Sequence, residues 1–116
     1  MTRQAAEKRG RLGETIAAWW LRLHGWRILA QRVKVRAGEV DLVARRGRTV
    51  AFIEVKSRTR AVDLDTAIDA WRLRRVAAAA NAVAAKYAPK GEDIRIDVIL
   101  IAPFAWPRHL TNVWHG

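Results

Sequence analysis

The sequence predicts a mixed α/β fold in a single domain over residues 1–116. Its length suits one ordinary domain and is too short for two, and 51% of its residues are apolar, enough for a real core. Segments with helical periodicity also alternate with short runs of strand-forming residues. Together these observations predict the order α-β-β-β-α-β, in which a central mixed sheet is flanked by helices.

The first predicted element is a helix over residues 4–24. Apolar residues recur there at intervals of three and four, the spacing of one helix face. They are Leu12, Ile16, Trp19, Trp20 and Leu23, with Ala17, Ala18 and Leu21 widening the face. Gly25 follows as a left-handed cap. We expect the helix tryptophans, Trp71 of the second helix included, to pack in the core.

Three strands, a second helix and a fourth strand are predicted next. The strands cover residues 26–36, 39–45, 48–57 and 94–102, and the alanine-rich helix covers residues 66–88. Turns fall at residues 37–38 and 46–47, each of which contains a glycine. Residues 103–116 include Pro103 and Pro107, so we expect an irregular C-terminal tail there.

Positive charge is concentrated in the first half of the chain. The net charge is +11, and residues 1–60 hold 15 basic and 5 acidic side chains, against 7 and 6 in residues 61–116. A domain this basic attracts phosphate polyanions, so nucleic acid is the expected partner. An anionic membrane surface fits less well because the arginines do not line one amphipathic helix.

Several function classes are excluded by what the sequence lacks. It has no cysteine, which rules out disulfides, zinc–thiolate sites and a cysteine nucleophile. No apolar stretch is long enough for a transmembrane helix. The first residues also lack the apolar core of a signal peptide, so we expect a cytoplasmic protein.

The segment VAFIEVKSR, residues 50–58, places an acid and a base inside a core strand. Alternation puts Glu54 and Lys56 on the same face as Phe52. An unpaired buried charge costs several kcal/mol, so the pattern needs an explanation. Alone it would indicate an internal ion pair or a strand with one face in water. The nearby acid Asp41 favours a functional site instead.

The hairpin between the second and third strands brings Asp41 to Glu54. If Arg45 faces Arg48, the two acids are diagonal neighbours on one face, with Cβ atoms roughly 7 Å apart or less. A register shifted by two residues would put them directly opposite each other. In either register the two carboxylates converge beside Lys56.

Converging carboxylates repel each other unless a positive charge lies between them. Mg²⁺ or Mn²⁺ takes oxygen ligands and leaves positions for water and substrate phosphate. Such an ion lowers the pKa of a bound water, and a neighbouring lysine can orient that water or stabilise developing negative charge. The pattern therefore indicates metal-assisted hydrolysis of a phosphodiester.

The stretch GEVDLVARRGRTVAFIEVKSR, residues 38–58, resembles the PD-(D/E)xK nuclease signature. More closely, the chain is similar to the small bacterial YraN-like family of predicted endonucleases, which is related to archaeal Holliday-junction resolvases. GRLGETIAAWWLRLHGWRIL matches the first helix of that family, and IRIDVILI matches its last strand. The resemblance implies a restriction-endonuclease-like fold, and endonuclease activity on DNA that is branched or damaged.

The resemblance also implies roles residue by residue. Asp41 and Glu54 are implied as metal ligands, with the Val55 carbonyl as a candidate third, and Lys56 as the catalytic lysine. Glu14 matches the helix acid that completes such sites, as ligand and catalytic residue, in the resolvase relatives. Those relatives act as dimers, so the resemblance implies a homodimer as well.

Two site residues are left open by the sequence. Glu39, in the GE(I/V)D motif of the family, is either a ligand, an acid behind the ligands or a support for the turn. Arg72 stands where the family usually has a lysine, and arginine can clamp phosphate but cannot transfer a proton as a base. Phosphate contacts are assigned to five arginines that flank the predicted site: Arg45, Arg46, Arg48, Arg58 and Arg60.

The predicted function is metal-dependent hydrolysis of DNA phosphodiester bonds. Two alternatives remain open. One is a non-catalytic nucleic-acid-binding module with the same fold. The other is an interaction protein whose basic surface docks on RNA or on an acidic protein. Asp97 is interpreted as a partner of Arg95 and is not assigned to the site.

Overall fold

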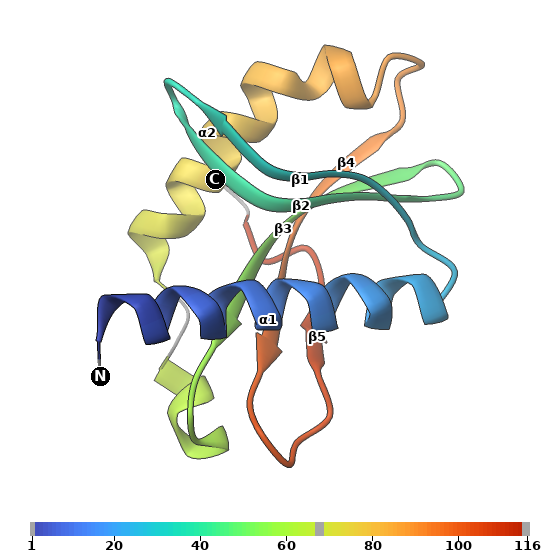
Figure 1. Cartoon of the computed structure of the whole chain (residues 1–116). Coiled ribbons are helices and arrows are strands. Elements are labelled where there is room, and N and C mark those ends of the chain that lie inside the picture. The colour runs from blue at the N-terminus through green and yellow to red at the C-terminus, as the bar shows by residue number, and fades with distance from the viewer. Residues whose placement is uncertain (1, 67–68, 115–116) are drawn as a thin grey trace.

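The computed structural model describes residues 2–66 and 69–114, with the backbone alone for 64–66. Within these residues, two long helices and a short 3-10 helix surround one five-stranded sheet (Figure 1). In chain order the elements are α1 (Arg3–Leu23), β1 (Arg27–Val35), β2 (Gly38–Arg46), β3 (Thr49–Ser57), η1 (Ala61–Thr66), α2 (Ala70–Tyr87), β4 (Asp93–Ile101) and β5 (Arg108–Leu110). The predicted order is confirmed, with β5 added at its end.

The sheet is mixed because the chain crosses over between β3 and β4. Its strand order is β1-β2-β3-β4-β5, with β3 and β4 parallel and every other neighbouring pair antiparallel. Parallel neighbours need a long connection, and η1 with α2 provides it. Figure 1 shows α1 lying across the strands, and α2 packs on the opposite face.

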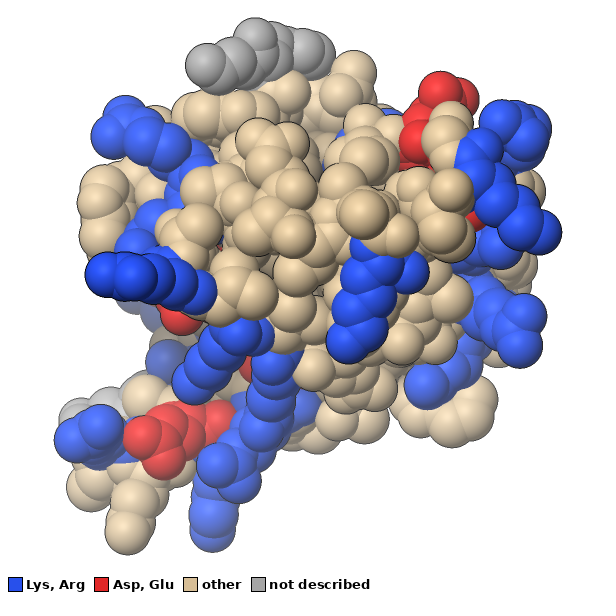
Figure 2. Space-filling view, turned by 90° about the horizontal axis from the view of Figure 1, so that it is seen from above, with Lys and Arg blue, Asp and Glu red and all other residues tan. Residues whose placement is uncertain are grey.

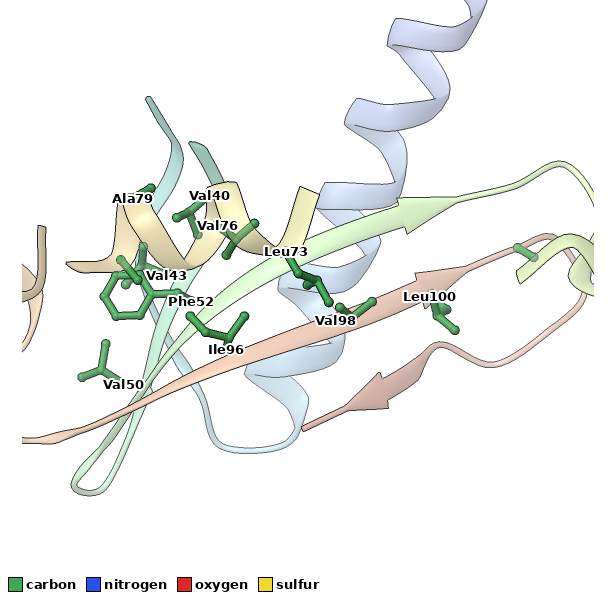
Figure 3. Close-up of a cluster of buried hydrophobic side chains, with 12 residues drawn as sticks. Val40, Val43, Val50, Phe52, Leu73, Val76, Ala79, Ile96, Val98 and Leu100 are labelled. Carbon is green, nitrogen blue, oxygen red and sulfur yellow. The ribbon is translucent and has the colours of Figure 1, made fainter. Parts of the chain in front are cut away.

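Each face of the sheet has its own hydrophobic core. The core under α2 contains Phe52, packed with residues such as Leu73 and Val76 (Figure 3). The core under α1 contains Ala51 and Ile53 of the same strand. The alternation predicted for β3 is therefore confirmed, and it places Glu54 on the α2 face of the sheet.

The β2–β3 hairpin fixes the position of the two acids. Its last strand pair joins Arg46 to Thr49, so the turn consists of Gly47 and Arg48. Gly47 has a φ of 60°, which glycine adopts without strain. Of the two registers left open by the sequence, the one with Arg45 facing Arg48 is wrong, and the one shifted by two residues is observed.

The face of α1 that packs on the sheet differs from the expected one. Small residues form it, and the helix lies so close that a Cβ on Gly13 would be 1.9 Å from Ser57 Oγ. Leu21 also packs on the sheet, whereas most of the other large apolar residues of the helix point away. Buried are Gly13, Ala17, Ala18 and Leu21, whereas Leu12, Ile16, Trp19 and Leu23 are exposed. Trp20 is half-buried, and the expectation of core packing is wrong for Trp19 and for Trp71 on α2, which are 58% and 57% exposed.

The second helix begins later than predicted. Residues 61–66 form η1, residues 67–68 lie outside the described residues, and α2 begins at Ala70. Asp69 caps the helix, since its Oδ1 accepts hydrogen bonds from the backbone N–H groups of Trp71 at 2.8 Å and Arg72 at 3.4 Å. Side-chain capping of this kind fixes where a helix starts.

The C-terminal tail contains a strand that the sequence did not predict. Residues 108–110 form β5 on the edge of β4, and the fully buried Asp97 fixes this arrangement. Its carboxylate lies 2.9–3.0 Å from Arg95 Nη2 and Nε, 2.8 Å from His109 Nε2 and 2.9 Å from the Asn112 backbone N. Burial alone would raise the pKa of Asp97, but these hydrogen bonds outweigh burial and lower it.

Positive side chains surround the face that carries α2. Figure 2 views the molecule from this side and shows Lys and Arg projecting around an uncharged centre. The edge strand β1 contributes exposed cations, among them Arg27, Arg32 and Lys34. Charged edge strands also resist pairing with other chains. No described helix is long and apolar enough to cross a membrane.

Candidate active site

Asp41 contacts β3 at the point where β2 leaves that strand. Pairing between the strands ends at Leu42 and Ile53. One residue further on, Asp41 Oδ2 accepts a hydrogen bond from the Val55 backbone N–H at 2.8 Å. The carboxylate thus takes a donor that strand pairing leaves unused, and it is held beside Glu54. The convergence of these two acids is the feature that the sequence pattern predicted.

Glu54 is buried between two cations. Its carboxylate is almost inaccessible, at 2% residue exposure. Lys56 Nζ lies 3.4 Å from Glu54 Oε1, and Arg72 Nη2 lies 3.1 Å from Oε1 and 3.4 Å from Oε2. A buried carboxylate is tolerated only with such partners, which explains how a core strand can carry Glu54.

Arg72 reaches Glu54 because α2 passes very close to β2. A Cβ on Gly38 would lie 2.0 Å from the Arg75 carbonyl oxygen, so only glycine fits there. This approach brings Arg72, in the first turn of α2, to both Glu54 and Glu39. Its Nη2 pairs with Glu54 and its Nη1 pairs with Glu39. Burial would lower the pKa of the Arg72 guanidinium, but Glu54 and then Glu39 raise it, so Arg72 stays charged.

Glu14 joins the site from α1 through a residue that the sequence analysis missed. Arg32 Nε donates a hydrogen bond to Glu14 Oε1 at 3.0 Å. Arg32 has a φ of 53°, unusual for a residue with a Cβ, and follows a bulge between Ile28 and Ala30. The available signal was the adjacent polar pair Gln31 and Arg32, which interrupts the alternation of β1.

Asp41 carries the least compensated charge of the site. Burial is the largest cause that raises its pKa and repulsion from Glu54 adds to it, with a smaller contribution from Glu14. The Val55 N–H and the charge of Arg72 oppose these effects, and the resulting pKa is about 7. Among the described residues, no cation forms an ion pair with Asp41. The group therefore favours a shared proton or an added cation.

Two grooves meet at these side chains. One, of about 430 Å³, runs between α1 and the β1–β2 edge and is lined by Arg11 and Arg32. The other, of about 270 Å³, lies between α1 and the end of β3 and is lined by Lys56 and Arg58. Both grooves include Glu14, Asp41 and Arg72 in their walls. A chain of phosphates passing through both would cross the acids.

The acids fit a divalent cation that keeps part of its water shell. No three Asp, Glu or His side chains within the described ranges are placed to enclose an ion. Mg²⁺ commonly needs only one or two carboxylates, with water and phosphate in its other positions. Asp41 and Glu54 supply two carboxylates, and a cation would relieve the repulsion that raises the pKa of Asp41. Glu14 and Glu39 both pair with arginines, and their part as ligands stays a prediction.

The five arginines predicted to bind phosphate fall into two groups. Arg58 lines the groove beside Lys56, and Arg60 is exposed just beyond β3. The remaining three lie at the far end of β2 and in the turn that follows it. At 3.3 Å per residue, that end of the strand is roughly 16 Å from Asp41. The three are Arg45, Arg46 and Arg48. The structure does not bring them to the acids, contrary to the expectation that they flank the site.

The mixed sheet, its two covering helices and the paired acids beside a lysine define a protein with a restriction-endonuclease-like fold. The Holliday junction resolvase Hjc of Archaeoglobus fulgidus has a similar structure, with a TM-score of 0.60 over 88% of this chain and 71% of that chain. At 23% sequence identity, this likeness establishes the fold alone.

The chain belongs to UPF0102, described as an uncharacterised protein family, whose sequence profile matches residues 13–101. A UPF0102 protein of Sphingopyxis alaskensis is 69% identical over 98% of both chains. One from Rhizorhabdus wittichii is 66% identical over 98% of this chain and 97% of its own. The predicted YraN-like membership is thereby confirmed.

Proposed function

We propose that this protein is a metal-dependent endonuclease that hydrolyses DNA phosphodiester bonds. The observation that carries the proposal is the hydrogen bond from the Val55 N–H to Asp41, which holds that carboxylate beside Glu54 and Lys56. Two grooves with basic residues in their walls meet at this point. Such an enzyme would act in the cytoplasm on branched or damaged DNA.

Asp41 and Glu54 are the residues that would hold Mg²⁺ or Mn²⁺, with the Val55 carbonyl as a candidate third ligand. When bound, the ion would lower the pKa of a water and neutralise charge on the phosphate. Hydrolysis joins the water oxygen to phosphorus and breaks one phosphorus–oxygen bond, so a proton must leave the water and another must reach the departing oxygen.

Lys56 is the residue best placed to assist this exchange. Its ammonium group is held by Glu54 at 3.4 Å and lies in the wall of the groove. From there it can orient the attacking water or stabilise charge that develops on the phosphate. Arg58, in the same wall, is placed to bind a neighbouring phosphate of the strand.

One observation favours a second candidate, a nucleic-acid-binding module that does not cut. Arg72 already neutralises Glu54 and Glu39, so these acids are satisfied without any metal ion. A binding module would use the same basic grooves and would be indifferent to Mg²⁺. A protein that binds RNA or an acidic protein would also be indifferent to Mg²⁺. A preference for one of those partners over DNA would distinguish it.

The deciding experiment measures cleavage of labelled duplex, single-stranded, flap and four-way junction DNA with Mg²⁺, Mn²⁺ or EDTA. Asp41→Asn keeps an acceptor for the Val55 N–H, Glu54→Gln keeps the side-chain shape, and Lys56→Gln removes the ammonium group. Asp93→Asn is the control, because it removes an exposed carboxylate beside the hairpin turn, at the other end of β3.

Cleavage that needs a divalent metal and is lost in the three site variants, but kept in the control, is the expected result. Wild-type protein that is folded and binds DNA, yet cuts no substrate with either metal, would contradict the proposal and support the binding module. The described residues of each chain form one such site, so cutting two strands would take two copies. Dimerisation therefore stays a prediction.

A further inference from the structure

Arg72 is held in an arrangement that leaves part of its guanidinium unused. Two of its nitrogens pair with Glu39 and Glu54. Its Nε is buried and has no hydrogen-bond partner in the described part of the chain. A purely structural arginine would be expected to have all its buried donors satisfied. The unpaired donor therefore shows that pairing with the two acids does not fully satisfy the guanidinium.

The position of Arg72 suits a phosphate group as a ligand. Its side chain is in the walls of both grooves, at the point where they meet. A strand that enters either groove would bring its phosphates to this guanidinium. The planar fork of donors on an arginine matches phosphate oxygens as well as it matches a carboxylate.

Arg72 also occupies acceptor positions on Glu54 that a metal ion could use. Its Nη2 lies within 3.4 Å of both Glu54 oxygens, and Lys56 approaches one of the same oxygens. A carboxylate offers about four acceptor positions in all. These contacts take up about three of the four, so a cation that binds both Glu54 oxygens must compete with the guanidinium.

We propose that Arg72 couples DNA binding to metal binding. In the free chain it pairs with Glu54 and Glu39 and keeps affinity for the ion low. A DNA phosphate at the junction of the grooves draws the guanidinium away and opens Glu54 to the ion. This inference rests on the proposed function, because it assigns both ligands to the same site.

Coupling of this kind is reciprocal, so DNA and the ion must raise each other's affinity by the same factor. Couplings between sites are typically 5–150-fold, and we expect about tenfold here. The measurement is Mn²⁺ binding to the full chain by calorimetry, with and without an oligonucleotide whose phosphorothioate linkages resist cleavage. No enzymatic activity enters this measurement.

Arg72→Met and Arg72→Lys separate the roles of charge and geometry. Arg72→Met should bind Mn²⁺ about tenfold more tightly than wild type without DNA and should lose most of the effect of DNA. Arg72→Lys keeps a positive charge beside Glu54 but cannot bridge two groups as a fork, so it should give an intermediate result. It keeps the test decisive if Arg72→Met does not fold.

Two negative outcomes are distinguishable. If both variants match wild type in Mn²⁺ affinity and in the effect of DNA, the role of Arg72 is refuted. The proposed function survives that result provided that Asp41→Asn abolishes Mn²⁺ binding. If wild type binds no more Mn²⁺ than Asp41→Asn, with DNA or without it, the proposed metal site fails and the coupling fails with it.

Discussion

Replacing Gly38 with alanine should destabilise the fold by forcing α2 away from β2. The added Cβ would lie 2.0 Å from the Arg75 carbonyl oxygen, 2.8 Å from its carbon and 3.1 Å from its Cα. All three are backbone atoms inside a helix, so no side-chain rotation can relieve the overlap. The helix must shift as a body, and with it the guanidinium of Arg72.

The sign of this effect on stability is informative, because alanine at position 38 would stabilise the protein if the contact with α2 were absent. Gly38 is not among the residues with positive φ, so its backbone conformation is open to alanine. A Gly→Ala change at such a position usually stabilises a protein by about 0.4–1 kcal/mol. Overpacking costs about 1–3 kcal/mol, and contact with rigid backbone places Gly38 at the top of that range. We therefore expect a net loss of about 2 kcal/mol.

Thermal and denaturant unfolding followed by circular dichroism would measure this loss. In a domain of this size, 2 kcal/mol corresponds to a fall in Tm of roughly 8 °C. Gly10→Ala on α1 is the matched control, because nothing lies within 4 Å of its added Cβ and alanine favours helix by about 1 kcal/mol. A Gly38→Ala protein as stable as wild type would show that α2 does not pack against β2 as described.

Three further predictions concern charge. The pKa of Asp41 is raised from 3.8 to about 7 by folding, so its contribution to stability is full below pH 3.8 and is lost as pH rises through 7. The shift corresponds to at most about 4 kcal/mol. We expect Asp41→Asn to be about 2 kcal/mol more stable than wild type at pH 8. Denaturant titrations should show this difference and should show it vanish near pH 4. Asp97→Asn should lose about 3 kcal/mol at pH 7, because Arg95 would keep a charge without its partner. The pKa of Asp97 is lowered, so wild type alone should lose this stability as pH falls below 3.8, and equal acid sensitivity of the two proteins would contradict the assignment. Finally, Arg58→Gln should weaken DNA binding and reduce its salt dependence by about one ion in fluorescence titrations, whereas Lys86→Gln, at the far end of α2, should leave both unchanged.

The strands and the central pair of acids could be predicted because their signals are local. Alternation in β3 determines which side chains share a face, and this placed Glu54 and Lys56 together. A short hairpin limits the registers to a few, and both registers considered bring Asp41 to Glu54. The actual register depends on Gly47, whose positive φ allows a turn of two residues.

Features that depend on contacts between distant elements could not be predicted in the same way. Periodicity in α1 marks Ile16 and Trp19 as apolar, but it cannot show that the smaller Gly13 and Ala17 would allow a closer approach to the sheet. The close fit of the small residues, and not the hydrophobicity of the large ones, determines which face of α1 packs on the sheet. The position of Arg32 depends likewise on a bulge in β1 and on a partner from α1.

The hairpin arginines show the limit of proximity in sequence. Arg45 and Asp41 are four residues apart, yet an extended strand carries them to different places on the molecule. Arg72, by contrast, lies in the crossover connection, eighteen residues from Glu54, and still reaches its carboxylate. Only the parallel pairing of β3 with β4 brings α2 back over the sheet.

The two-residue turn has a consequence for how the chain can change over evolutionary time. Gly47 and Arg48 lie far from the acids, yet they set the fourteen-residue separation that aligns Asp41 with the Val55 N–H. Adding one residue there, with the pairing slipped to match, would turn the side chains of one strand to the opposite face. The cores and the acids would be lost together. Substitutions that keep the conformation of this turn can therefore be tolerated, whereas an insertion or deletion that changes its length would abolish the site.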